Sequence, residues 1–224
     1  MPWVLSFIVV LILVWIYWIL IRAPHLEQVQ YDSLLTHGRL KTGTIVLFHA
    51  LDNINPVIIG SYWGHMGIVW VDPDDPSQTP WVFEAAPAKQ MPLKSHHNPN
   101  GIFINRLEDR VKRYAGFVAI KELSGCVSDQ KARDFKTFIN FALVNLSYNY
   151  NCFANAARKL IGERINKKVN CGEMVFLSAI KLGILNKKEY TVPRLHHLLY
   201  MARIQDTQLG KYKDPVYVLH APFE

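Results

Sequence analysis

Cys171 has the surroundings in this chain that most favour nucleophilic chemistry. It follows a polar, basic loop containing Lys167, Lys168 and Asn170, and it opens an apolar segment with helical spacing. A thiol at a helix N-terminus lies at the positive end of the helix dipole, which stabilises the thiolate. A nearby imidazole would stabilise the thiolate further and return a proton to a leaving group. A buried cysteine that packs as a small hydrophobe is the alternative, so Cys171 alone leaves both interpretations open.

His65 and Glu84 lie in two apolar segments that are predicted to be neighbouring strands. His65 stands between Gly64 and Gly67, and such glycines let backbone or substrate approach closely. Glu84 lies inside an apolar run, where a carboxylate is costly unless it is paired. On the next strand, Glu84 could hold the tautomer of the imidazole as the third member of a triad. The loop between the strands is too long to fix their register. A core histidine and a solvent-facing glutamate on an edge strand therefore remain the alternatives.

The elements that must position these residues come as strands first and helices later. Apolar runs predict strands over residues 44–48, 66–71, 81–85, 102–107, 117–123 and 216–220, with turn chemistry over 72–79. Helical spacing predicts helices over residues 31–37, 130–145 after an N-cap at Ser128, 153–161, 171–182 before Gly183, and 192–202 from Pro193. This order predicts an α+β fold, with an antiparallel sheet packed on helices in one domain over residues 41–224.

The composition limits the classes of protein to which the chain can belong. Its 224 residues are 50% hydrophobic and 19% charged, which is not typical of a disordered protein. The net charge is +7, and residues 156–214 hold 12 Lys and Arg against 5 Asp and Glu. A basic face near a membrane attracts anionic lipid headgroups, although a solvated surface without a partner fits equally well. Zinc-finger spacing, RNA-recognition motifs and Gly-rich phosphate loops are missing from the sequence, so no nucleic-acid partner is expected.

The first residues predict a transmembrane anchor over residues 1–22, followed by a tether and short helix over 23–40. Residues 2–21 carry no charge, and a helix of about 20 apolar residues can cross a bilayer. Trp3 near one end and Trp18 near the other resemble interfacial aromatic belts. A cleaved signal peptide fits less well, because no Lys or Arg precedes the apolar run.

The charges after this segment place the domain on the cytosolic side of the membrane. Three basic residues follow the apolar run: Arg22, Arg39 and Lys41. The three cysteines are widely spaced and form no CxxC motif: Cys126, Cys152 and Cys171. This pattern argues against disulfides and structural zinc, and it fits a reducing compartment such as the cytosol or a virion interior. The glycosylation sequon at residues 145–147 favours the opposite, luminal side.

Four short motifs in this order resemble the permuted papain-like amidase superfamily. They are residues 43–48 (GTIVLF), 64–69 (GHMGIV), 82–85 (VFEA) and 171–175 (CGEMV), with Tyr148 and Tyr150 before the last one. The superfamily includes bacterial YiiX-type proteins, lecithin:retinol acyltransferase and poxviral relatives. It is the circularly permuted branch of the NlpC-type cell-wall peptidases. Two positions depart from its pattern, because Thr44 replaces the usual Asp and Gly64 replaces the usual Ser.

This resemblance implies a membrane-anchored cysteine hydrolase or acyltransferase that acts on an amide or ester bond through an acyl-enzyme. It implies Cys171 as nucleophile, His65 as general base and Glu84 as the orienting group, with no cofactor. Further binding positions in the same motifs are Gly64, Gly67, Gly172 and Tyr150. The expected substrate is a peptide, a lipid or a lipidated protein at a membrane. The alternative is a catalytically silent, membrane-anchored structural or adaptor protein, for example of a large virus particle, that retains the papain-like fold.

The remaining polar residues give no strong second site. The histidine pairs at 96–97 and 196–197 consist of adjacent residues, and adjacent side chains on a helix point apart, so no metal site is predicted. Glu173 falls in the first turn of a predicted helix, where an acidic side chain complements the helix dipole. Cys126 and Cys152 are expected to be core or bystander thiols.

Overall fold

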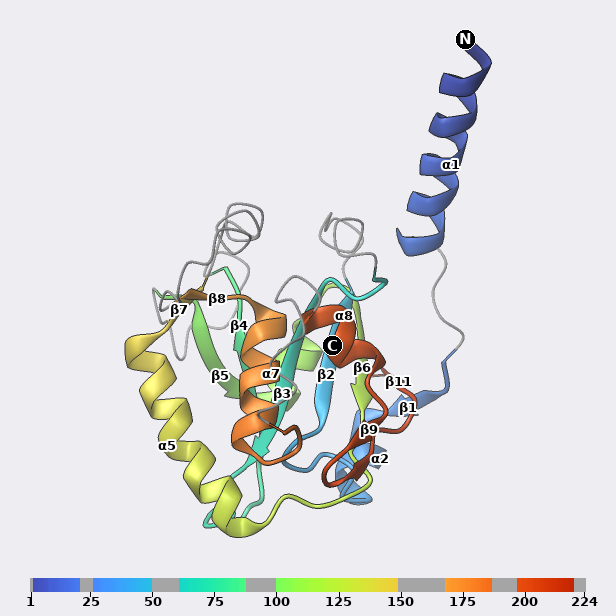
Figure 1. The fold of residues 1–224 in the computed structure, drawn as a ribbon. Coiled ribbons are helices and arrows are strands. Elements are labelled where there is room, and N and C mark those ends of the chain that lie inside the picture. Colours follow the sequence, from blue (N-terminus) through green and yellow to red (C-terminus); the bar gives the residue numbers. More distant parts are fainter. Residues whose placement is uncertain are drawn as a thin grey trace.

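The computed structural model, which describes residues 2–20, 26–49, 61–87, 100–148, 168–186 and 197–219, is built around a seven-stranded sheet (Figure 1). The strand order is β1-β11-β6-β2-β3-β4-β5, and every pairing is antiparallel except the parallel one between β1 and β11. The strands are β1 (Gln28–Gln30), β2 (Ile45–His49), β3 (His65–Val71), β4 (Pro80–Ala85), β5 (Ile102–Arg106), β6 (Phe117–Lys121) and β11 (Val216–Leu219). The α+β class and the mainly antiparallel sheet are thereby confirmed.

Helices cover both faces of this sheet because successive side chains along a strand point to opposite faces. Met66, Ile68 and Trp70 of β3 join one hydrophobic cluster, to which three helices contribute: α5 (Asp129–Asn145), α7 (Cys171–Lys181) and α8 (His197–Arg203). Val69 of β3 joins a second cluster with two short helices: α2 (Tyr31–Thr36) and α4 (Leu107–Lys112). The helix that begins with Cys171 packs directly on β3 and β4 (Figure 1).

Side-chain caps fix the starts of the two long helices of the domain. The Ser128 side chain accepts a hydrogen bond from the backbone N–H of Lys131 at the start of α5. Oδ1 of Asn170 accepts one from the N–H of Glu173 at 2.7 Å and so caps α7. After α7, Gly183 has φ +75°, a left-handed conformation that glycine adopts without steric cost. The helix starts after Ser128 and at Cys171, and the glycine after α7, were predicted from the sequence, and the structure confirms them.

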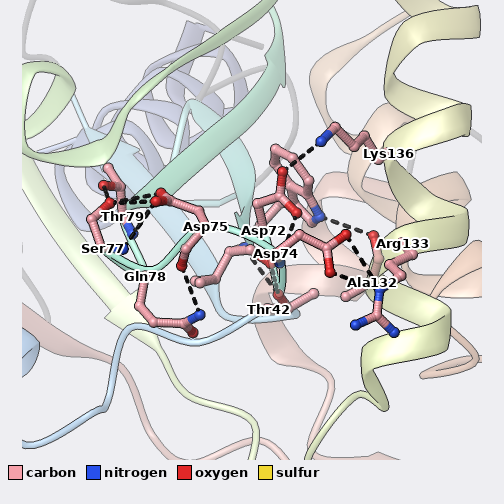
Figure 2. Close-up of polar contacts among 12 residues, drawn as sticks. Thr42, Asp72, Asp74, Asp75, Ser77, Gln78, Thr79, Ala132, Arg133 and Lys136 are labelled. Carbon is pink, nitrogen blue, oxygen red and sulfur yellow. Dashed lines mark hydrogen bonds and ion pairs between the residues drawn. The ribbon is translucent and has the colours of Figure 1, made fainter.

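The loop between β3 and β4 is long, but polar contacts order it and tie it to α5 (Figure 2). Oδ1 of Asp72 and of Asp75 accepts hydrogen bonds from backbone N–H groups two residues ahead, as expected for turn-forming aspartates. Lys136 Nζ lies 2.6 Å from Asp72 Oδ2, and Arg133 Nε lies 3.0 Å from Asp74 Oδ1. The loop is therefore ordered, and β3 and β4 pair with Gly67 opposite Glu84, a register that the sequence alone could not specify.

Several elements differ from those expected from the sequence. Residues 28–30, which were expected to lie in a tether, form β1 and extend the main sheet beside β11. The helix α4 and two small sheets are additional: β7 (Ser147–Tyr148) with β8 (Lys168–Val169), and β9 (Asp206–Thr207) with β10 (Gly210–Lys211). The helix predicted over residues 153–161 lies outside the described residues, as does the start of the helix predicted from Pro193.

The apolar N-terminal segment forms the helix α1 (Pro2–Leu20), which extends away from the sheet in Figure 1. Within the described ranges, no helix combines the length and the hydropathy needed to cross a membrane. The transmembrane anchor expected over residues 1–22 is therefore not confirmed.

Candidate active site

His65 and Glu84 meet diagonally across the β3–β4 ladder. Glu84 lies opposite Gly67, two residues beyond His65, so all three residues are on the same face of the sheet. Diagonal neighbours in a ladder lie within reach of long side chains, and Gly67 has no side chain in the way. His65 Nε2 lies 2.6 Å from Glu84 Oε2. The structure thus brings together the imidazole and the carboxylate that the sequence analysis paired.

Glu84 is fully buried, and it has a second partner in Arg110. Its exposed fraction is 0%, and β4 lies between β3 and β5, so the solvent-facing edge glutamate considered above is excluded. Arg110 Nε donates to Glu84 Oε1 at 2.8 Å, and Nη2 donates to Oε2 at 3.2 Å. The carboxylate is therefore held by two cationic side chains inside the core.

Arg110 sets the charge of this carboxylate. Burial alone would raise the pKa of Glu84, but the charge of Arg110 and the hydrogen bond with His65 lower it to about 2. Glu84 is consequently an anion at neutral pH, as a group that must orient an imidazole requires.

His65 links this carboxylate to Cys171. Burial alone would lower the pKa of His65, but its hydrogen bond with Cys171, followed by the one with Glu84, raises the pKa to about 9. Because Nε2 contacts Glu84, Nδ1 is the ring nitrogen that remains for the sulfur of Cys171. The ring of Phe48 packs 5.3 Å from the ring of His65, centroid to centroid, and limits its rotation. Cys171, His65 and Glu84 thus form one continuous chain of contacts.

Cys171 is the first residue of α7 and is 7% exposed, so the thiol lies at a helix N-terminus as predicted. Two residues later, Glu173 is 4% exposed, and burial raises the pKa of its carboxyl to about 7. Glu173 is therefore only partly ionised at neutral pH, so its expected favourable interaction with the helix dipole is weaker.

For the other described residues of the sequence motifs, the structure shows backbone and packing contacts. The backbone N–H of Gly64 donates to the Phe48 carbonyl at 3.1 Å, and Gly67 packs against Val82. Gly172 is buried in α7, while Tyr150 lies outside the described residues. The histidines at 96, 97 and 196 also lie outside them. In the described part of the chain, no group of three or more His, Cys, Asp and Glu could hold a metal ion.

Sequence reasoning missed Arg110, although two signals pointed to it. Glu84 lies in an apolar run, and a buried carboxylate needs a cationic partner. Leu107, Arg110 and Val111 are spaced so that all three lie on one face of a helix, and all three are buried. No helix was predicted over these residues, so the pairing of Arg110 with Glu84 became visible only in the structure.

Comparisons with known proteins give only remote likenesses, all of them to solved structures. No family model matches the sequence, and no curated protein matches it. The crystal structure of the metalloprotein YiiX from Escherichia coli O157:H7 resembles this chain with a TM-score of 0.38 and 12% sequence identity. The match covers 83% of this chain and 99% of that chain. A likeness this remote says nothing about the chemistry of the site, which depends on the contacts described above.

Proposed function

We propose that this protein is a cysteine hydrolase or acyltransferase with a permuted papain-like fold, which acts on an amide or ester bond. The observation that carries the proposal is the chain of contacts from Cys171 through His65 to Glu84. A nucleophile, a base within reach of it and a third group that orients the base are the signature of covalent catalysis.

The geometry suggests a role for each side chain. The thiolate of Cys171 attacks the carbonyl carbon, and a carbon–sulfur bond replaces the bond to the leaving amine or alcohol. His65, protonated at neutral pH, gives its Nδ1 proton to that leaving group. The neutral imidazole then takes a proton from water or from an acceptor, whose oxygen or nitrogen displaces the sulfur. Glu84 holds the Nε2–H throughout. The N-terminal N–H groups of α7, including that of Cys171, stabilise the oxyanion.

The substrate class belongs to the proposal as well. A peptide, a lipid ester and a lipidated protein all present a carbonyl that a thiolate can attack. Cys126 and Cys171 are free thiols, which suits the reducing compartment expected from the sequence. The alternative to this proposal is a catalytically silent structural protein.

Site-resolved labelling with iodoacetamide across pH tests the proposal, with mass spectrometry as the readout. Cys126 is exposed and serves as an internal control, whereas Cys171 is buried. We expect Cys171 to react faster than Cys126 at pH 6 to 7 despite its burial, and His65→Ala to slow it by about tenfold or more. Labelling of Cys171 no faster than that of Cys126, and indifferent to His65→Ala, would point to the silent structural protein.

A further inference from the structure

We propose that Arg110 is a positioning residue of this site, which fixes the Glu84 carboxylate against His65 and supplies the positive charge that balances two anions. The inference rests on the proposed function, because it concerns the same thiol and imidazole. Arg110 touches neither Cys171 nor a substrate in this scheme, so its effect is transmitted through Glu84.

The hydrogen bonds show how the position of the carboxylate is fixed. Arg110 Nε binds Oε1 at 2.8 Å, and Nη2 binds Oε2 at 3.2 Å, which fixes the plane of the carboxylate. Oε2 is then the oxygen that faces His65 Nε2 at 2.6 Å. A lysine ammonium is a point charge and cannot reproduce this two-point contact.

The surroundings of Arg110 keep the guanidinium itself in place. It projects from α4, which follows β5 without an intervening loop, and Leu107 and Val111 of the same helix are fully buried. The guanidinium carbon lies 4.4 Å from the ring centroid of Phe48 and 5.1 Å from that of Tyr114. Phe48 also packs on His65, so one aromatic ring contacts both the arginine and the imidazole.

Charge gives Arg110 a second effect, on pH dependence. The contacts run from Arg110 on α4 to Glu84 on β4, then to His65 on β3 and to Cys171 on α7. Cations and anions alternate along this chain when the thiol is ionised. Glu173 on α7 is the further acidic group near the thiol. Without Arg110, the Glu84 carboxylate and the thiolate share the single positive charge of His65, so the two anions are less well balanced.

The test is the pH profile of Cys171 alkylation in Arg110→Gln and Arg110→Lys. We expect Arg110→Gln to move the acid limb of the profile upward by about one pH unit or more, so that labelling at pH 6 falls about tenfold. Arg110→Lys should restore the midpoint, because it keeps the charge, but it should lower the plateau rate, because it loses the two-point contact. Two variants that lower the plateau equally, with no movement of the midpoint, would show a packing role and overturn the inference.

A comparison in the Glu84→Gln background keeps the inference testable even if the single variant Arg110→Gln does not fold. In the Glu84→Gln background, adding Arg110→Gln should cause no further loss of labelling rate, because the arginine acts through the carboxylate. A further loss would overturn the inference. A wild type whose labelling is fast and depends on His65, together with an unchanged Arg110→Gln profile, would overturn this inference alone. Slow, His65-independent labelling of the wild type would overturn the proposed function and this inference with it.

Discussion

A Cβ atom on Gly67 would lie 2.6 Å from Cγ2 of Val82, closer than side-chain carbons approach in proteins. The same atom would lie 3.3 Å from the Cβ of Glu84. We therefore expect Gly67→Ala to push β3 away from β4, to lower the free energy of unfolding by about 1 to 3 kcal/mol, and to slow Cys171 labelling several-fold. Urea unfolding and iodoacetamide labelling measure the two effects.

The control for this change is Gly38→Ala. Gly38 has φ +62°, and an added Cβ would meet nothing within 4 Å. Its cost should be about 1 kcal/mol of backbone strain, without any change in labelling. Equal labelling rates in Gly67→Ala and wild type would show that the close strand spacing does not serve the His65–Glu84 contact.

The two capped helices allow a matched pair of substitutions. Asn170→Ala and Ser128→Ala each remove one side-chain cap, and each should cost about 1 kcal/mol of stability. Only Asn170→Ala removes the cap of α7, the helix that begins at Cys171, so it alone should slow Cys171 labelling. Thermal unfolding monitored by circular dichroism checks the stabilities. Slower labelling in both variants would mean that general stability, and not the position of Cys171, controls its reactivity.

Stability should fall as pH rises through the titration of His65. Its folded pKa of about 9 is above the ordinary value of 6.5, so the stabilisation is complete below pH 6.5 and is lost as the pH approaches 9. The full effect is about 3 kcal/mol at most. Urea unfolding at intervals from pH 6 to pH 9.5 measures it. His65→Gln should flatten the curve in this window, and an equally steep curve in that variant would assign the loss to another group.

Glu84 gives the opposite dependence at acid pH. Its folded pKa of about 2 is below the ordinary value of 4.5, so the stabilisation is present above pH 4.5 and is lost as the pH falls towards 2. We expect acid unfolding of the wild type to begin below pH 4.5. Glu84→Gln should be less stable at pH 7, because Arg110 loses its anion, and should depend less on pH in this range. A variant with the full acid dependence of the wild type would contradict the assignment.

The local elements of this fold follow from the sequence more readily than their long-range contacts. The run from Thr44 to Phe48 is apolar and β-branched, and the apolar positions after Ser128 have helical spacing, so both elements were predicted within a residue or two. The short strand β1 has only three residues, of which Val29 is buried, and it depends on β11 for its hydrogen bonds. Such a strand has no local signal.

In the candidate site, too, the single residues could be recognised from the sequence, but their contacts with one another could not. Cys171, His65 and Glu84 were recognisable because each interrupts or begins an apolar segment. Their contact depends on the register of β3 and β4, which the length of the loop between them left open in the sequence. Arg110 could not be assigned to Glu84 from spacing, because the two residues meet only when α4 folds back beside β4.

The place of β11 in the sheet has a consequence for biosynthesis. This strand lies between β1 and β6, so the first strand of the sheet has no neighbour until the last one has left the ribosome. Until then Tyr31 and Leu34 lack part of their apolar surroundings, and the edge of β6 is open to other chains. Pairing between segments so distant in sequence is slow to form. The nascent protein therefore carries an unpaired β1 and an open edge of β6 until residues 216–219 have been synthesised and have emerged, and such exposed edges favour aggregation.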